Sequence, residues 1–400
     1  MIAPKLRFSE FKDEWRSEKI SEIANVSSGS TPNRNNPSYW NGDIPWITTS
    51  LINFNTIEKA EEFITKEGLK NSSTKLYPKN TILMAMYGQG VTRGKVAILG
   101  IEATTNQACA SISLKPNFNV NFIFQNLSKR YEEIRDLSND GGQKNLSGSI
   151  IKEISISYPT EKEQTKIAEF LSTVDDKISQ LSRQLELLNK YKKGVMQKIF
   201  SQEIRFKNDN GEDFGEWDEK SIDEITEVVG GGTPSTSNQE YWDGEIVWLT
   251  PSEINRKYIS KSKRTISIEG VNNSSAKILP KGTVLFTSRA TIGEVAIAQN
   301  EVTTNQGFQS FIVKTDILNE FLYYWLIFNK NLFLERASGS TFLEVSKNSI
   351  KLITISLPPF LEQQKIAEFL TAIDERIDHT TAQLNHTKQW KKGLLQQMFV

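Results

Sequence analysis

The sequence contains a single cysteine in 400 residues, so an internal disulfide is excluded and no cluster of thiolates is available to bind zinc. Its 48 lysine and arginine residues are balanced by 48 aspartate and glutamate residues, which excludes a basic tail as the basis of function. No apolar run is long enough to cross a membrane, and the charged N-terminal segment lacks the apolar core of a signal peptide. We therefore expect a soluble, cytoplasmic protein.

Histidine is also scarce, with only His379 and His386 in the chain. No cysteine or carboxylate set completes a metal site around them, so we expect both on a solvated helix face. No P-loop sequence is present, and the sequence predicts neither ATP hydrolysis nor a bound cofactor. With 38% hydrophobic and 24% charged residues, the composition is typical of a folded protein that can form two domains or more.

The chain is a tandem repeat whose period is about half its length. The first copy reads SGSTPNRNNPSYWNGDIPWITTS from Ser28, and the second reads GGTPSTSNQEYWDGEIVWLTPS from Gly231. The later matches keep their order: SSTKLYPKNTIL with SSAKILPKGTVL, TTNQ with TTNQ, EKEQTKIAEFL with LEQQKIAEFL, and YKKGVMQKIF with WKKGLLQQMF. Cys109 aligns with Phe308, which predicts a small core residue and not a nucleophile. The segment after Phe200 resembles the chain's own start, so we expect the two termini to lie close together.

Each copy is predicted to form a mixed domain followed by a long helix. Short β-rich runs alternate with Gly, Pro and Asn, and one stretch per copy has apolar residues at helical spacing. The predicted fold class is α+β, with two pseudo-symmetric globular domains joined by two long antiparallel coiled-coil helices. The predicted boundaries are 1–160 for the first domain, 161–200 for a central spacer helix, 201–360 for the second domain and 361–400 for a C-terminal spacer helix.

The long helices are predicted from apolar residues that step by four and three in turn, as in a coiled coil. Lys192 interrupts this pattern in the first helix, and Thr380, Thr387 and Lys391 occupy such positions in the second. Packing of each helix on its own domain alone is the alternative. The predicted seam residues are Ile167, Leu171, Val174, Ile178, Leu181, Leu185 and Leu188 in the first helix, and Ile366, Leu370, Ile373, Ile377 and Leu384 in the second.

Charge indicates how these helices pair. Both are acidic near their starts and basic near their ends, so antiparallel pairing sets unlike charges together. Two similar antiparallel helices are related by a pseudo-two-fold axis, and we expect the two domains at opposite ends in inverted orientation. Duplex DNA has two-fold axes of its own. Because the two domains differ in their loops, the pattern predicts an asymmetric, bipartite DNA target.

The repeated segments also resemble a known family, the specificity (S) subunits of Type I restriction-modification enzymes. The resemblance covers nearly the whole chain, through the SGSTP and GGTP loops, PWI and VWL, the two TTNQ segments and the two KIAEFL helices. It implies two target-recognition domains on double-stranded DNA, and spacer helices that dock two copies of a modification (M) subunit. The M subunit carries S-adenosylmethionine and methylates adenine, and a restriction (R) subunit supplies translocation and cleavage. The resemblance implies that this chain itself catalyses nothing.

Two other functions remain as alternatives, a stand-alone adenine-N6 DNA methyltransferase and a bivalent protein-binding scaffold. NPSYW from Asn36 is similar to the Asn-Pro-Pro-Tyr clamp of adenine methyltransferases, but Ser38 is its third residue and NQEYW from Asn238 aligns with it. This alignment assigns the segment to the repeated scaffold. GQGVTRG from Gly88 lacks the spacing of a nucleotide fingerprint.

Residues shared by both copies cannot select different half-sites, so we predict a scaffold role for Trp40, Trp46, Trp242 and Trp248, and for Asn106, Gln107, Asn305 and Gln306. Base readout is expected where the copies diverge and stay polar, because Arg forms a bidentate pair with guanine, and Gln or Asn with adenine. The predicted DNA-binding residues are Thr48, Ser50, Tyr87, Gln89, Thr92, Arg93, Gln143, Lys144 and Asn145 in the first domain, and Ser252, Arg256, Lys257, Ser288, Arg289 and Thr291 in the second.

The zero net charge has a consequence for DNA affinity. Phosphate contacts require local positive potential, so the acidic residues must be segregated from the DNA-facing loops. We expect the isolated chain to bind DNA weakly and the assembled complex to bind it tightly.

Overall fold

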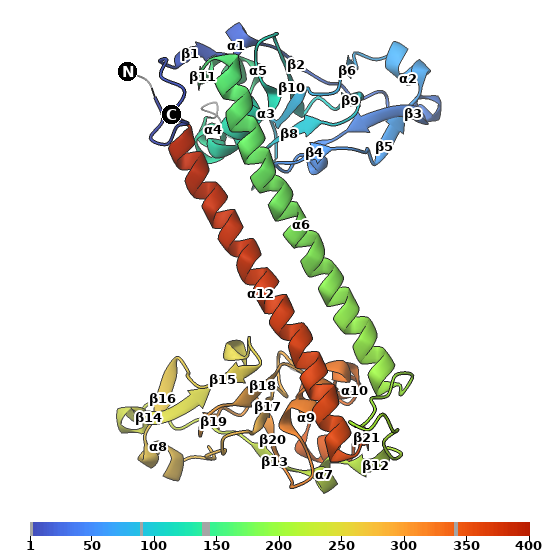
Figure 1. Ribbon diagram of the computed structural model, residues 1–400, viewed down its shortest axis with the longest axis vertical. Coiled ribbons are helices and arrows are strands. Elements are labelled where there is room, and N and C mark those ends of the chain that lie inside the picture. The colour runs from blue at the N-terminus through green and yellow to red at the C-terminus, as the bar shows by residue number, and fades with distance from the viewer. Residues whose placement is uncertain (1–2, 89–90, 138–144, 340–342) are drawn as a thin grey trace. The chain divides into compact units, whose positions relative to one another are not determined.

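The computed structural model describes residues 3–88, 91–137, 145–339 and 343–400 (Figure 1). The chain divides into two compact units, one of Met1–Arg183 with Thr381–Val400 and one of Gln184–Thr380. Each unit holds one globular domain and part of both long helices, α6 (Glu161–Phe200) and α12 (Phe360–Met398). Among the described residues, no helix is both long and apolar enough to cross a membrane.

A five-stranded sheet of order β2-β10-β7-β8-β4 forms the centre of the first domain. All neighbours are antiparallel except β4 and β8. Every residue of β7 and β8 is buried, and alternate side chains enter two hydrophobic clusters on opposite faces, Ile82 and Met84 in one and Leu83 and Ala85 in the other. The strands are β2 (Ala24–Ser28), β4 (Thr56–Ile57), β7 (Ile82–Ala85), β8 (Val96–Leu99) and β10 (Cys109–Leu114).

A second sheet, of order β5-β3-β9-β6, packs beside the first, and β1 pairs with β11. β3 contains a bulge, because Trp40 and Ile44 both face Ile64 of β5. The strands are β1 (Arg16–Lys19), β3 (Trp40–Ile47), β5 (Glu62–Ile64), β6 (Leu76–Tyr77), β9 (Ala103–Thr105) and β11 (Ser155–Tyr158).

The second domain repeats this topology, except that the equivalent of β6 is reduced to an isolated bridge between Leu279 and Val302. Its sheets have the orders β13-β20-β17-β18-β15 and β16-β14-β19, with β12 paired to β21. The bulge recurs in β14, where Trp242 and Ile246 both face Ile266. The strands are β12 (Asp218–Ser221), β13 (Thr226–Gly230), β14 (Trp242–Leu249), β15 (Tyr258–Ile259), β16 (Arg264–Ile266), β17 (Val284–Phe286), β18 (Val295–Ala298), β19 (Thr303–Thr304), β20 (Gln309–Val313) and β21 (Thr354–Leu357).

Short helices occupy equivalent places in both domains, and some of the pairs begin at equivalent capping residues. Thr65 and Ser267 accept hydrogen bonds from the amides of Gly68 and Gly270, as expected of helix N-caps. The paired helices are α1 (Ile20–Ile23) with α7 (Ile222–Ile225), α2 (Lys66–Lys70) with α8 (Ile268–Asn272), α3 (Val120–Lys129) with α9 (Asn319–Phe328), α4 (Tyr131–Asp136) with α10 (Lys330–Glu335), and α5 (Gly148–Glu153) with α11 (Lys347–Lys351).

The repeated Glu-Gln pair at the start of each long helix fixes that helix to its domain. In α6, the buried Glu163 accepts a bidentate pair of hydrogen bonds from Arg7, at 2.7 and 2.8 Å. The adjacent Gln164 accepts the amide of Asn119, which caps α3. In α12, Glu362 and Gln363 make the equivalent bonds with Arg205 and the amide of Leu318.

The two described ends of the chain meet in the first unit, as the wrap-around of the repeat predicts. The amide of Leu6 donates to the carbonyl of Gln397 at 2.9 Å, and the rings of Phe122 and Phe399 lie 5.1 Å apart. Figure 1 shows the C-terminal end of α12 beside the N-terminal segment.

The pairing of α6 with α12 is antiparallel, which confirms the prediction from charge. In the first unit, Lys391 near the end of α12 pairs with Asp175 near the start of α6 at 2.6 Å. In the second unit, Lys192 near the end of α6 pairs with Asp374 near the start of α12 at 2.5 Å. The two lysines that interrupt the heptad pattern are therefore the partners of aspartates on the other helix.

Apolar contacts follow the same exchange. The core of the first unit contains Ile167, Leu171 and Val174 of α6 together with Leu394 and Met398 of α12. The core of the second contains Val195, Met196 and Ile199 of α6 with Ile366, Leu370 and Ile373 of α12. Each helix thus packs on a domain core and on the other helix at once, which rejects packing on its own domain alone. Of the other predicted seam residues, Leu181 and Leu384 are buried and Ile178, Leu185, Leu188 and Ile377 are half-buried.

Reversal of one of these ion pairs tests the pairing. Lys391→Asp sets two carboxylates together, and we expect it to lower the free energy of unfolding by about 1 kcal/mol, measured by urea denaturation. The double variant Asp175→Lys/Lys391→Asp should recover most of this loss. Lys388→Asp, the same change at an exposed position of α12, is the control and should cost little. A double variant no more stable than Lys391→Asp would contradict the pairing.

Candidate nucleic-acid interface

The tryptophans shared by the two copies build turns, which supports their predicted scaffold role. Trp40 and Trp46 pack edge to face with ring centroids 5.1 Å apart, and Trp242 and Trp248 do so at 5.0 Å. The indole N–H of Trp46 donates to the carbonyl of Ser30, and the other three donate to loop carbonyls in the same way. These rings are therefore held in place by their own domain.

The TTNQ segment fastens the loop that carries SGSTP or GGTP. Gln107 accepts the hydroxyl of Thr31 at 2.6 Å, and Gln306 accepts that of Thr233 at 2.5 Å. A Cβ at Gly29 would lie 2.0 Å from the carbonyl oxygen of Thr105, so only glycine allows this close approach of the two segments.

The asparagines of TTNQ have internal partners too. The side-chain oxygen of Asn106 accepts the amide of Ala108, and that of Asn305 accepts the amide of Gly307. These bonds support the scaffold role predicted from duplication.

The single cysteine is a core residue, as its alignment predicts. Cys109 is fully buried in the second hydrophobic cluster of the first domain, and burial raises the pKa of its thiol to about 12. Within the described ranges, no group of three or more His, Cys, Asp or Glu side chains is placed to hold a metal ion.

Polar side chains gather after β3 and after β14, at equivalent places. Thr48 and Ser50 flank the start of the short helix η2 (Thr49–Leu51), and their hydroxyls lie 2.6 Å apart. In the second domain Ser252 lies in η4 (Pro251–Glu253), and its hydroxyl is 3.1 Å from that of Thr250. Ser50 and Ser252 are exposed, so both remain available to a ligand.

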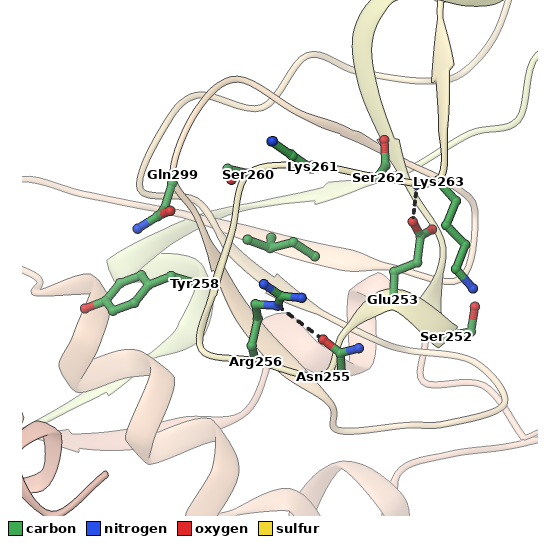
Figure 2. Close-up of a pocket in the computed structure, with 11 residues that line it drawn as sticks. Ser252, Glu253, Asn255, Arg256, Tyr258, Ser260, Lys261, Ser262, Lys263 and Gln299 are labelled. Carbon is green, nitrogen blue, oxygen red and sulfur yellow. Dashed lines mark hydrogen bonds between the residues drawn. The ribbon is translucent and has the colours of Figure 1, made fainter. Parts of the chain in front are cut away.

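The segment after η4 lines a pocket of about 360 Å³ (Figure 2). Figure 2 shows Arg256 at its centre, between Tyr258 on one side and Glu253 on the other. Glu253 is already engaged, because its carboxylate accepts the amides of Thr250 and Lys263 at 2.9 and 2.7 Å. The remaining charged side chains of the pocket, those of Arg256, Lys261 and Lys263, are basic and exposed.

The loop after β7 carries four predicted residues, of which Gln89 lies outside the described residues. Tyr87 is 41% exposed and Thr92 is half-buried. Arg93 donates to the carbonyl of Arg135 at 3.2 Å, which ties the loop to the end of α4. Tyr87 is thus the most accessible of the described residues in this group.

The segment before α5 lies beside that loop, because the amide of Leu146 donates to the carbonyl of Met86 at 3.0 Å. Asn145 is half-buried at this position, and Gln143 and Lys144 lie outside the described residues.

The prediction for Ser288 is wrong. Its side chain is fully buried, and its amide donates to the carbonyl of Gly307 at 2.8 Å, so it has no surface to offer to a base. The alignment of the loops gave its position but not the direction of its side chain. Thr291 nearby is exposed, and Arg289 is half-exposed while its guanidinium donates to Glu344 at 3.0 Å.

The structure does not favour Lys257 as a DNA contact, because this half-buried side chain already has partners within the chain. Its ammonium donates to the hydroxyls of Thr371 in α12 and Tyr324 in α9, at 2.7 and 3.1 Å. Burial lowers its pKa, an effect opposed by the nearby Asp374, and burial also raises the pKa of Tyr324. Lys257 therefore connects the domain to α12. In the sequence, its polarity alone does not distinguish a base contact from such a network.

The sequence predictions did not include three exposed basic residues near the pocket. Lys261 and Lys263 line it, and Arg264 follows at the start of β16. A comparison of charge at aligned positions of the two copies would have found them, since the first copy has Lys59, Glu61 and Glu62 there.

A family model described as "Type I restriction modification DNA specificity domain" matches the chain twice, at residues 12–190 and 215–389. The chain belongs to this family. Each match contains one globular domain and most of the long helix that follows it, so the specificity-domain repeat of the family is the repeat seen in the sequence and in both units.

Relatives within the family carry specificity-subunit names. The chain is 44% identical over 191 residues to the Type I restriction enzyme MjaIX specificity subunit of Methanocaldococcus jannaschii, an alignment of 46% of this chain and 44% of that one. It is 29% identical over 204 residues to the EcoR124I/EcoR124II specificity subunit of Escherichia coli, with 49% and 50% covered. The chain thus spans about half the length of these curated relatives.

The similarity of fold between this chain and a solved structure extends over the whole chain. The crystal structure of the S subunit of a Type I restriction-modification system from M. genitalium matches 100% of this chain and 99% of its own, with a TM-score of 0.64 and 18% sequence identity. This specificity-domain fold therefore accounts for both domains and both long helices.

Substitution of a shared glutamine tests its scaffold role. Gln107→Ala removes the bond to Thr31, and we expect it to lower the free energy of unfolding by about 1 kcal/mol, measured by urea denaturation. Gln299→Ala is the matched control, because this exposed side chain makes no hydrogen bond within the described structure. Equal stability of the two variants would exclude the scaffold role of Gln107.

Proposed function

We propose that this chain is the non-catalytic DNA-recognition subunit of a Type I restriction-modification complex. It binds an asymmetric, bipartite target in double-stranded DNA and docks M subunits, which supply S-adenosylmethionine and adenine methylation, and R subunits, which supply cleavage. The observation that carries the proposal is the presence of two copies of one domain with the same scaffold and different polar loops.

The difference between the loops supports an asymmetric target. Where the first domain has the apolar Phe54, the second has the exposed Arg256. Groups that donate and accept hydrogen bonds at different places read different base edges in the major groove, so the two half-sites differ. The described residues that we assign to DNA are Thr48, Ser50, Tyr87, Thr92, Arg93 and Asn145 in the first domain, and Ser252, Arg256, Arg289 and Thr291 in the second.

The helices support docking of two M subunits. Asp175 with Lys391 in one unit and Asp374 with Lys192 in the other form the same crossing, with the roles of α6 and α12 exchanged. A chain that offers the same helical surface twice binds two copies of one partner, as repeated surfaces do in symmetric assemblies. The complex works on cellular DNA, which places it in the cytoplasm.

The balanced charge supports a division of DNA affinity between subunits. With 48 basic and 48 acidic residues, the chain alone lacks the excess positive charge that phosphate binding draws on. M subunits add phosphate contacts, and the complex binds DNA more tightly than the chain does.

Genome-wide mapping of methylated adenine tests the proposal. Cells that contain this chain and its M partner should methylate adenines in one asymmetric sequence made of two parts with an unread gap. Loss of the chain alone should abolish this methylation and leave other methylated sequences unchanged. Methylation of the same sequence without the chain, or of an unsplit sequence, would refute the proposal.

A further inference from the structure

The segments that follow η2 and η4 occupy the same place in the two domains but carry opposite charge. Segment 252–264 of the second domain contains five basic residues and one glutamate, a formal charge of +4. Segment 50–62 of the first contains one lysine and three glutamates, a formal charge of −2. In a chain without net charge, this is a strong local difference.

A change at one tryptophan contributes to this reversal. In the first domain the guanidinium carbon of Arg34 lies 3.8 Å from the ring centroid of Trp40, and the guanidinium pairs with Glu62 of β5. In the second domain Arg264 occupies the position of Glu62. Its guanidinium carbon lies 3.6 Å from the ring centroid of Trp242. Both domains therefore have a guanidinium stacked on the equivalent tryptophan, although the arginine comes from a different element in each. Among the described residues, only the first domain has a carboxylate paired with it.

Apart from Lys257, which faces α12, the basic residues of the second segment have no acidic partner among the described residues. Arg256, Lys261, Lys263 and Arg264 are exposed, and none forms an ion pair within the part of the chain that the structure describes. Glu253, the one acid of the segment, is held by the amides of Thr250 and Lys263 at the wall of the pocket (Figure 2).

We propose that Lys261, Lys263 and Arg264, at the end of segment 252–264, bind the sugar-phosphate backbone of duplex DNA, and that the first domain has no equivalent site. The inference rests on the proposed function and adds to it that the two domains hold DNA unequally. Exposed Lys and Arg beside the hydroxyl of Ser260 are the groups that contact phosphate oxygens. Glu58 and Glu61 repel phosphate at the same place in the first domain. The second half-site thus receives most of the sequence-independent attraction.

The salt dependence of binding to a random-sequence duplex tests this site, with the chain assembled with its M subunits. Each phosphate contact adds about 0.9 to the slope of log affinity against log salt. Lys261→Gln should make the slope shallower by about 0.9, and Lys261→Gln/Lys263→Gln by about 1.8. Lys59→Gln is the matched control, because Lys59 occupies the position in the first copy that Lys261 occupies in the second. The slope measured for Lys59→Gln should equal that of the wild type. Lys59 and Lys261 are both exposed, so the fold is preserved in either variant.

The outcomes separate the site from the proposed function. With methylation of the split sequence intact, an unchanged slope for both Lys59→Gln and Lys261→Gln would overturn the phosphate site alone. Equal changes for the two variants would overturn its restriction to the second domain. An unchanged slope with loss of M-subunit binding in size-exclusion chromatography would overturn the phosphate site in favour of a protein-docking surface. A wild-type complex without salt-dependent affinity for DNA would overturn both. A methylated sequence that stays the same while the slope falls supports the site, because phosphate contacts carry no base information.

Discussion

The antiparallel packing of α6 against α12 is the constraint on which the rest of the structure depends. It brings a lysine of one helix to an aspartate of the other in each unit, Lys391 to Asp175 and Lys192 to Asp374. It also lets each domain core include side chains from both helices. Because the chain's two ends meet on the first unit, that unit is completed by the last turns of α12, and the repeat closes on itself.

The duplicated domain separates what is kept from what varies. The Glu-Gln pair at each helix start, the edge-to-face tryptophans and the Thr-to-Gln bond recur in both copies with nearly the same distances. These contacts are local to a domain and specify its fold. The exposed segments 50–62 and 252–264 make none of these repeated contacts, and their formal charges have opposite signs. One scaffold can therefore present two different surfaces to DNA.

Much of this architecture could be predicted from the sequence, because the repeat aligns the scaffold residues and the heptads and charges indicate the helix pairing. The sequence was not sufficient where the direction of a side chain decides its role. Ser288 and Lys257 are polar and differ between the copies, yet one is buried against Gly307 and the other bonds to Thr371 of α12. The arginine over Trp242 comes from β16 and not from the loop that supplies Arg34, a replacement that alignment of single positions does not reveal.

The central claim is that each domain reads one half of a split target. An exchange tests it most directly: residues 217–358 are replaced by a second copy of residues 15–159, which begin and end at equivalent positions of the repeat, and methylated adenines are mapped. The account predicts a target with two copies of the first half-site in opposite orientation and an unchanged gap. Persistence of the original asymmetric sequence would contradict it.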